Sequence, residues 1–60
     1  MFTLNIETTN DAFGDGVGRR FETARILREV IRSLEDDGNI RGKVRDVNGN
    51  AVGEWELTDD

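Results

Sequence analysis

The sequence predicts an α+β domain in which a single helix packs on one face of a three-stranded sheet. Three observations lead to this fold class: a long helical pattern over residues 19–37, an alternating stretch over residues 2–7, and an Asn-Gly turn between two further alternating stretches. The expected element order is strand, helix, strand, strand. Sixty residues make one domain, 1–60, near the lower size limit for a stable core.

The helix over residues 19–37 has the longest regular pattern in the chain. Its apolar residues recur every three or four positions, which places them on one side of a helix. Gly38 follows as the expected left-handed stop. We expect this side to cover the sheet; its residues are Phe21, Ala24, Leu27, Ile31 and Leu34, with Ile26 and Val30 widening it.

The first strand alternates apolar and polar residues, so that Phe2, Leu4 and Ile6 face the core. Residues 8–18 contain three glycines and form a loop. Phe13 and Val17 are its expected anchors to the core, and Asp15 is a candidate cap for the helix N-terminus.

Asn48-Gly49 predicts a hairpin with a type I′ turn, which needs positive φ at both positions. The resulting register pairs Val44 with Gly53 and Gly42 with Trp55 on the inner face, beside Ile40 and Leu57. On the outer face it pairs Lys43 with Glu54 and Arg41 with Glu56. Apolar pairs inside and opposite charges outside both favour this register.

The predicted strand order is 1-3-2, all antiparallel. This order buries Trp55 under the helix, with Leu27 and Ile31, and it avoids a parallel pair. The alternative is order 1-2-3 with strands 1 and 2 parallel.

Composition narrows the functional classes. Cysteine and histidine are absent, so neither disulfides nor an ordinary zinc site can stabilise the domain. No apolar run approaches the roughly 20 residues of a membrane span, and no signal peptide is visible, so we expect a cytoplasmic protein. The net charge of −5 disfavours general binding to DNA or anionic membranes and is compatible with a basic protein partner.

Motifs for chemistry are weak. The glycines of residues 14–18 lack the spacing of a phosphate-binding loop, so a flexible connection is favoured. Residues 46–57 carry Ala51 and Leu57 where a calcium-binding EF-hand needs glycine and glutamate, so a hairpin turn is favoured. With no histidine, cysteine or tyrosine and with Ser33 as the sole serine, we expect no enzyme, no catalytic or metal-binding residue and no cofactor.

Basic residues form two stripes. Arg25, Arg28 and Arg32 follow the helix, and Arg41, Lys43 and Arg45 follow one strand. Either stripe could bind nucleic acid. Acidic neighbours accompany both stripes, so an internally paired, solvated surface is the favoured interpretation.

The acidic residues show a more informative pattern. Glu35, Asp36 and Asp37 end the helix, where the helix dipole is already negative. The predicted topology brings the end of the third strand to the same place. We call the resulting cluster the acidic end; it consists of Glu35, Asp36, Asp37, Glu56, Asp59 and Asp60. Acidic residues at an energetically unfavourable position can mark a binding site. The interpretation that they only keep the protein soluble is equally well supported by the sequence.

Three segments resemble a group of small proteins from phages, prophages and bacterial genomes: MFTLNIETTNDAF, TARILREV and GKVRDVNGNAVGEWEL. The resemblance covers nearly the whole chain, but its motifs are structural, and no functional residue can be carried across. The segment GDGVG departs from the acidic, helix-starting segment of that group.

This resemblance, together with the size and charge, implies an inhibitor of the anti-CRISPR, anti-defence kind. Such a protein acts without catalysis, as a DNA mimic. Its acidic end would occupy the basic nucleic-acid-binding surface of a CRISPR effector subunit, in the host cytoplasm if the protein is phage-encoded.

Two alternatives stay open. The first is a homodimer with a structural or phage-assembly role, which associates through the outer sheet face where Val47 and Val52 would be exposed. The second is a small nucleic-acid-binding module that uses Arg41, Lys43 and Arg45.

Overall fold

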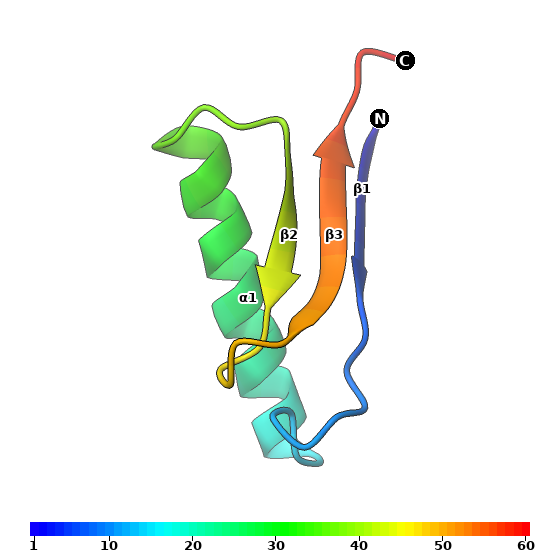
Figure 1. The fold of residues 1–60 in the computed structure, drawn as a ribbon, viewed down its shortest axis with the longest axis vertical. Helices are drawn as coiled ribbons and strands as arrows, with labels where there is room; N and C mark the ends of the chain where they lie inside the picture. Colours follow the sequence, from blue (N-terminus) through cyan, green and yellow to red (C-terminus); the bar gives the residue numbers. More distant parts are fainter.

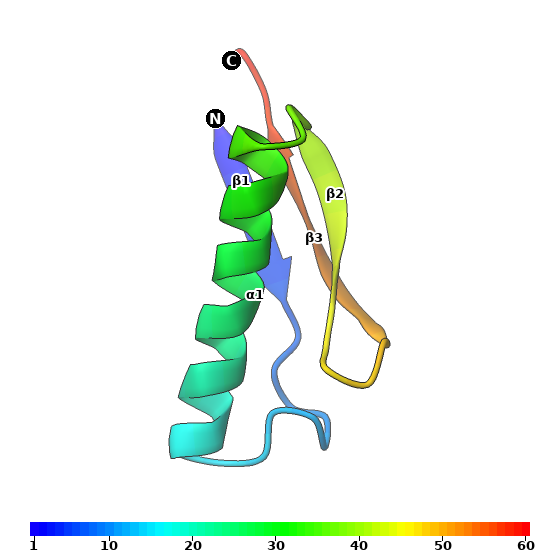
Figure 2. The same ribbon diagram turned by 90° about the vertical axis from the view of Figure 1, so that its left-hand side faces the viewer.

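The computed structural model describes residues 1–60 and contains one helix and three strands: β1 (Phe2–Ile6), α1 (Val17–Glu35), β2 (Arg41–Arg45) and β3 (Ala51–Leu57). The strands form one antiparallel sheet in the order β1-β3-β2, and α1 lies along one face of it (Figures 1 and 2). The predicted fold class, strand order and strand directions are confirmed. Because β3 is central, the two ends of the chain lie side by side at one end of the molecule.

The predicted hairpin register is confirmed along β2, where Gly42 pairs with Trp55 and Val44 pairs with Gly53. The prediction of a type I′ turn at Asn48-Gly49 is wrong. The Gly49 N–H donates to the Asp46 carbonyl at 2.9 Å, which makes Val47 and Asn48 the central residues of the turn. In this turn only Gly49 has a positive φ, of 88°.

The turn introduces a bulge in β3. From Val44 to Arg45 β2 advances by one residue, while the partner residue on β3 changes from Gly53 to Ala51. Val52 is therefore the extra residue, and a bulge reverses the direction of the side chain. Val52 is buried in the core, so its expected exposure on the outer sheet face is wrong. Val47 is exposed as expected.

Gly53 is required by the close approach of β1. A Cβ at Gly53 would lie 1.8 Å from the carbonyl oxygen of Asn5, far inside van der Waals contact. At Gly42, a Cβ would lie 2.9 Å from Nε1 of Trp55. The two glycines thus give room to the neighbouring strand and to the indole, as glycines in strands commonly do.

The helix covers the sheet with a different side from the one predicted. Ile26 and Val30 are buried, together with Glu22, whereas Phe21, Leu27 and Ile31 are 69%, 42% and 52% exposed. The expectation that Leu27 and Ile31 cover Trp55 is therefore wrong. Apolar residues on α1 extend over more than one side, and the buried Glu22 selects the side that meets the sheet.

The helix also begins earlier than predicted, at Val17, and ends at Glu35. Its N-cap is Gly16, and no side chain caps the first turn, so the capping role expected of Asp15 is wrong. Gly38 has the predicted left-handed conformation, with φ of 68°.

The core is small and lies between α1 and the sheet. Trp55 is buried as predicted, with the ring centroid of Phe2 at 6.0 Å. The expected anchoring role is confirmed for Phe13 and wrong for Val17, which is 59% exposed. Ile40 and Leu57, expected inside, are also largely exposed. The buried apolar residues are Phe13, Ile26, Val30, Val44, Val52 and Trp55.

A pair of adjacent substitutions tests the rotation of the helix. Ile26→Ala should lower the free energy of unfolding by about 2–5 kcal/mol, because it leaves a cavity in a core of six residues. Leu27→Ala, the matched control, should cost much less. Chemical denaturation of both variants measures the difference, and equal losses would contradict the observed rotation.

Candidate functional site

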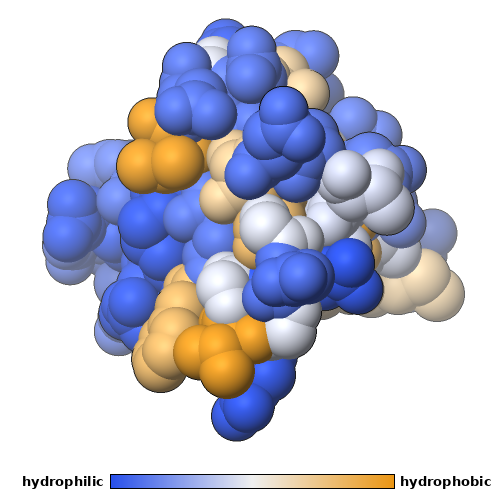
Figure 3. Space-filling view, turned by 90° about the horizontal axis from the view of Figure 1, so that it is seen from below, coloured by the Kyte–Doolittle hydropathy of each residue, from blue (hydrophilic) through white to orange (hydrophobic).

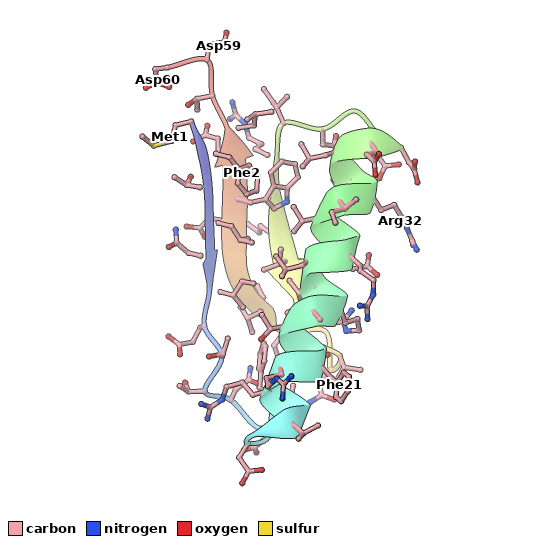
Figure 4. All side chains as sticks on the ribbon, turned by 180° about the vertical axis from the view of Figure 1, so that it is seen from behind. Met1, Phe2, Phe21, Arg32, Asp59 and Asp60 are labelled. Atoms are coloured by element: carbon pink, nitrogen blue, oxygen red, sulfur yellow. The ribbon has the colours of Figure 1, made fainter.

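The acidic end is a feature of the fold as well as of the sequence. The C-terminus of α1, the start of β2 and the end of β3 lie at one end of the molecule (Figure 1). Asp59 and Asp60 project there, at the end of the molecule where α1 carries Arg32 (Figure 4). All six predicted residues are exposed: Glu35, Asp36, Asp37, Glu56, Asp59 and Asp60.

Within the acidic end the six residues form two groups. The helix group, Glu35 to Asp37, and the group that follows β3 lie on opposite sides of the start of β2 (Figure 1). Glu56 belongs to β3 and follows the inward-facing Trp55, so it points away from α1. The acidic end therefore presents negative charge over a broad surface.

Two cationic side chains, Arg41 and Arg32, lie at this end of the molecule. Arg41 lies 3.9 Å from the Glu56 carboxylate, with both side chains well exposed, which gives a weak ion pair. Arg32, in the last turn of α1, interacts favourably with the negative end of the helix dipole. The chain contains no group of three or more acidic side chains that could hold a metal ion.

The two predicted basic stripes converge on one groove. This groove, of about 620 Å³, lies between α1 and β2. Five cationic residues and three carboxylates line it, a balance of 5 − 3 = +2. The sequence alone did not reveal that the two stripes meet, and Arg28, expected in the first stripe, does not line the groove. The lining cations are Arg25, Arg32, Arg41, Lys43 and Arg45, and the carboxylates are Glu29, Asp37 and Asp46.

Glu22 is the first of two buried carboxylates. Arg25 donates to both of its oxygens, from Nε at 2.8 Å and from a terminal nitrogen at 2.9 Å. The N–H of Val47 also donates to it, at 2.8 Å. Arg25, followed by the Val47 N–H, holds the pKa of Glu22 below its ordinary value of 4.5, against the opposing effect of burial.

Asp46 is the second buried carboxylate. Its Oδ1 accepts the N–H groups of Asn48 and Asn50, both at 2.9 Å. Its Oδ2 accepts the side-chain amides of Asn10, at 2.8 Å, and of Asn50, at 3.2 Å. Burial acts to raise the pKa of Asp46, but the hydrogen bonds from Asn50, Asn10 and Asn48 outweigh it and hold the pKa below its ordinary value of 3.8.

These two carboxylates form a polar junction, defined here as Asn10, Glu22, Arg25, Asp46 and the turn that follows Asp46. It connects the loop after β1, the first turns of α1 and the β2–β3 turn. Its role is structural, because every bond satisfies a group within the chain. A sequence signal existed in the Asp-x-Asn-x-Asn spacing, since Asp side chains commonly bond their own turn.

The opposite end of the molecule has mixed character. Seen from the end where α1 begins, separate hydrophobic patches are surrounded by hydrophilic side chains (Figure 3). The exposed apolar side chains of Val17, Phe21 and Val47 belong to the elements at this end. This end therefore exposes both apolar and polar side chains.

No protein-family model, curated protein or solved structure matches the chain. The helix α1 does not combine the length and the apolar character needed to cross a membrane.

The polar junction predicts how stability depends on pH. The pKa values of Glu22 and Asp46 are lower in the folded state than in the unfolded state. Their contribution is therefore present above their ordinary values of 4.5 and 3.8 and is lost as the pH falls through the lower values of the folded state. Thermal melts should show the parent weakening over that range. Glu22→Gln with Asp46→Asn should be less stable at neutral pH and should vary less with acid.

Exposed carboxylates provide the control for this measurement. Glu54→Gln with Asp59→Asn removes the same number of charges from side chains that accept no hydrogen bond within the chain. This variant should keep the acid dependence of the parent. If the junction variant also keeps it, the junction does not control the acid response.

Proposed function

We propose that this protein is a non-enzymatic interaction module whose acidic end binds a surface rich in lysine and arginine on a partner protein. The observation that carries the proposal is that Asp36 and Asp37 lie at the same end of the molecule as three further exposed carboxylates at the end of β3, in a chain with a net charge of −5. Charge of one sign on an exposed surface steers a partner of opposite charge toward it.

The energetics support a role beyond solubility. Each carboxylate at the helix C-terminus opposes the dipole, at a cost of a few tenths of a kcal/mol. A solubilising charge could lie anywhere on the surface, including the N-terminal turn of α1, where it would stabilise the helix. That turn instead carries no acidic residue.

The class of partner follows from this charge. A nucleic-acid-binding protein has a cationic channel that recognises regularly spaced phosphates, and a broad acidic surface can compete for it. The resemblance to small phage proteins favours a CRISPR effector subunit in the host cytoplasm. The protein would then act as a DNA mimic that blocks nucleic-acid binding.

Charge reversal tests the acidic end. Replacing Asp36, Asp37, Asp59 and Asp60 by lysine changes the net charge from −5 to +3, since each reversal adds two. These residues are exposed, and two of them oppose the helix dipole, so folding should be unharmed. Against a panel of purified, guide-loaded CRISPR effectors, interferometry should show an effector that binds the parent and binds this variant at least about tenfold more weakly.

A matched control separates location from net charge. Reversing the exposed Glu7, Asp11, Asp15 and Glu29 also gives +3 but leaves the acidic end intact. This control should retain most of the affinity, and target DNA should compete with it as with the parent. Equal losses in both variants would assign the effect to net charge and contradict a localised site, as would parent-like binding by the first variant.

The groove between α1 and β2 supports a second candidate function, the binding of nucleic acid. Its five cations come from both walls, and Lys43 makes no ion pair. Fluorescence anisotropy with a labelled single-stranded DNA at low salt tests it. If this candidate is right, Arg41→Glu with Lys43→Glu should abolish binding, and Arg19→Glu with Arg20→Glu should preserve it. An absence of binding by the parent would eliminate this candidate.

A further inference from the structure

β1 is an edge strand without the usual protection. Its residues, Phe-Thr-Leu-Asn-Ile, include no charge and no proline. Natural edge strands commonly carry lysine, proline or a bulge that prevents pairing with another chain. The other edge, β2, is protected, because it carries Arg41, Lys43 and Arg45 and because Arg25 donates to the Arg45 carbonyl at 3.0 Å.

The backbone groups on the free side of β1 can be identified. The Thr58 N–H donates to the Met1 carbonyl at 2.9 Å, and the Glu7 N–H donates to the Val52 carbonyl at 2.7 Å. Odd-numbered residues therefore bond β3. In an antiparallel pair the bonding direction alternates along the strand, so the N–H and C=O groups of Phe2, Leu4 and Ile6 point to the free edge.

These groups are self-complementary. In an antiparallel pairing of two β1 strands with its two-fold axis at Leu4, Leu4 meets its own copy and Phe2 meets Ile6. All three residues present their N–H and C=O groups to the facing strand, as hydrogen-bonded pairs require. We propose that β1 pairs in this register with β1 of a second copy of this chain, giving a homodimer with a continuous six-stranded sheet.

The side chains fit the same arrangement. On the inner face, Phe2, which is 43% exposed, would lie beside the half-buried Ile6 of the other copy. On the outer face Thr3 would lie opposite Asn5. Neither face brings like charges together, and aliphatic and aromatic cross-strand pairs stabilise sheets.

The exposed surface indicates the same side of the molecule. Arg25 and Arg32 face the groove beside β2. At about 100° per residue, Leu27 and Ile31 lie on the opposite side of α1, which is the side of β1. The chain exposes 4434 Å², against about 4,000 Å² expected for a folded monomer of this mass. A second copy at β1 would cover part of this surface.

The dimer is independent of the acidic end as a site. Because the strands run antiparallel and β1 starts beside the acidic end, the two acidic ends would lie at opposite extremes of the assembly. This interface also differs from the outer sheet face, which presents polar and charged side chains along β1 and β3: Thr3, Asn5, Glu54 and Glu56.

Two charge variants on the outer face test the interface and its register. Thr3→Lys with Asn5→Lys places lysine opposite lysine twice across the two-fold axis. Thr3→Lys with Asn5→Glu places lysine opposite glutamate twice. Both residues are exposed. Within one chain they lie opposite Glu56 and Glu54, so the double-lysine variant should fold at least as well as the parent.

Sedimentation equilibrium over micromolar to millimolar concentrations gives the result. The parent should dimerise, the double-lysine variant should dissociate roughly tenfold more readily, and the lysine–glutamate variant should dimerise at least as tightly as the parent. A synthetic chain with an N-methyl group on Leu4 should be monomeric, because that amide points to the free edge; its melting temperature should stay near that of a monomeric parent sample. A parent that is monomeric throughout, a dimer insensitive to the double-lysine change, or equal dissociation of both charge variants would overturn the proposal.

Discussion

The hydrogen bonds to the buried carboxylates of Glu22 and Asp46 control how the helix meets the sheet. Burying a charge is unfavourable unless hydrogen bonds, with or without a counter-ion, replace the lost water. Glu22 meets this requirement with Arg25 and the Val47 N–H, and Asp46 meets it with its own turn and Asn10. No buried side-chain polar atom is left without a partner. Since Glu22 must face the β2–β3 turn, the rotation of α1 about its axis is fixed.

That rotation determines which surfaces remain for function. Ile26 and Val30 follow Glu22 into the core, while Leu27 and Ile31 are turned away from β2 and stay exposed. Arg25 and Arg32 are brought to the groove beside β2. One local arrangement of charges thus separates a cationic side of the helix from an apolar side. In a domain with six buried apolar residues, such an arrangement has a large influence because little hydrophobic burial competes with it.

The central position of β3 explains the remaining surfaces. It places the end of the chain at the same end of the molecule as the end of α1, where the acidic residues lie, and it leaves β1 at one edge with a free row of backbone groups. The acidic end offers electrostatic attraction over a distance, whereas an edge strand offers directional hydrogen bonds at contact. The two surfaces can therefore act separately, one toward a basic partner and one toward a second copy.

The fold class, the strand order, the main register and the position of the acidic end could be predicted from the sequence, because they depend on local periodicity and short connections. Alternation identified Phe2 to Ile6 as a strand, and opposite charges at Lys43 and Glu54 identified the hairpin register. These patterns act over a few residues, so a single sequence is sufficient to reveal them.

Only the tertiary structure decided the rotation of α1, the burial of Val52 and the convergence of the two basic stripes. Helical spacing is equally compatible with burial of Phe21, Leu27 and Ile31 and with burial of Ile26 and Val30. Which side of α1 is buried depends on the contact of Glu22 with the turn at Val47, 25 residues away. Val52 points into the core because it is the extra residue of the bulge, between the pairs Val44–Gly53 and Arg45–Ala51. Each outcome depends on contacts between distant segments, and periodicity carries no information about such contacts.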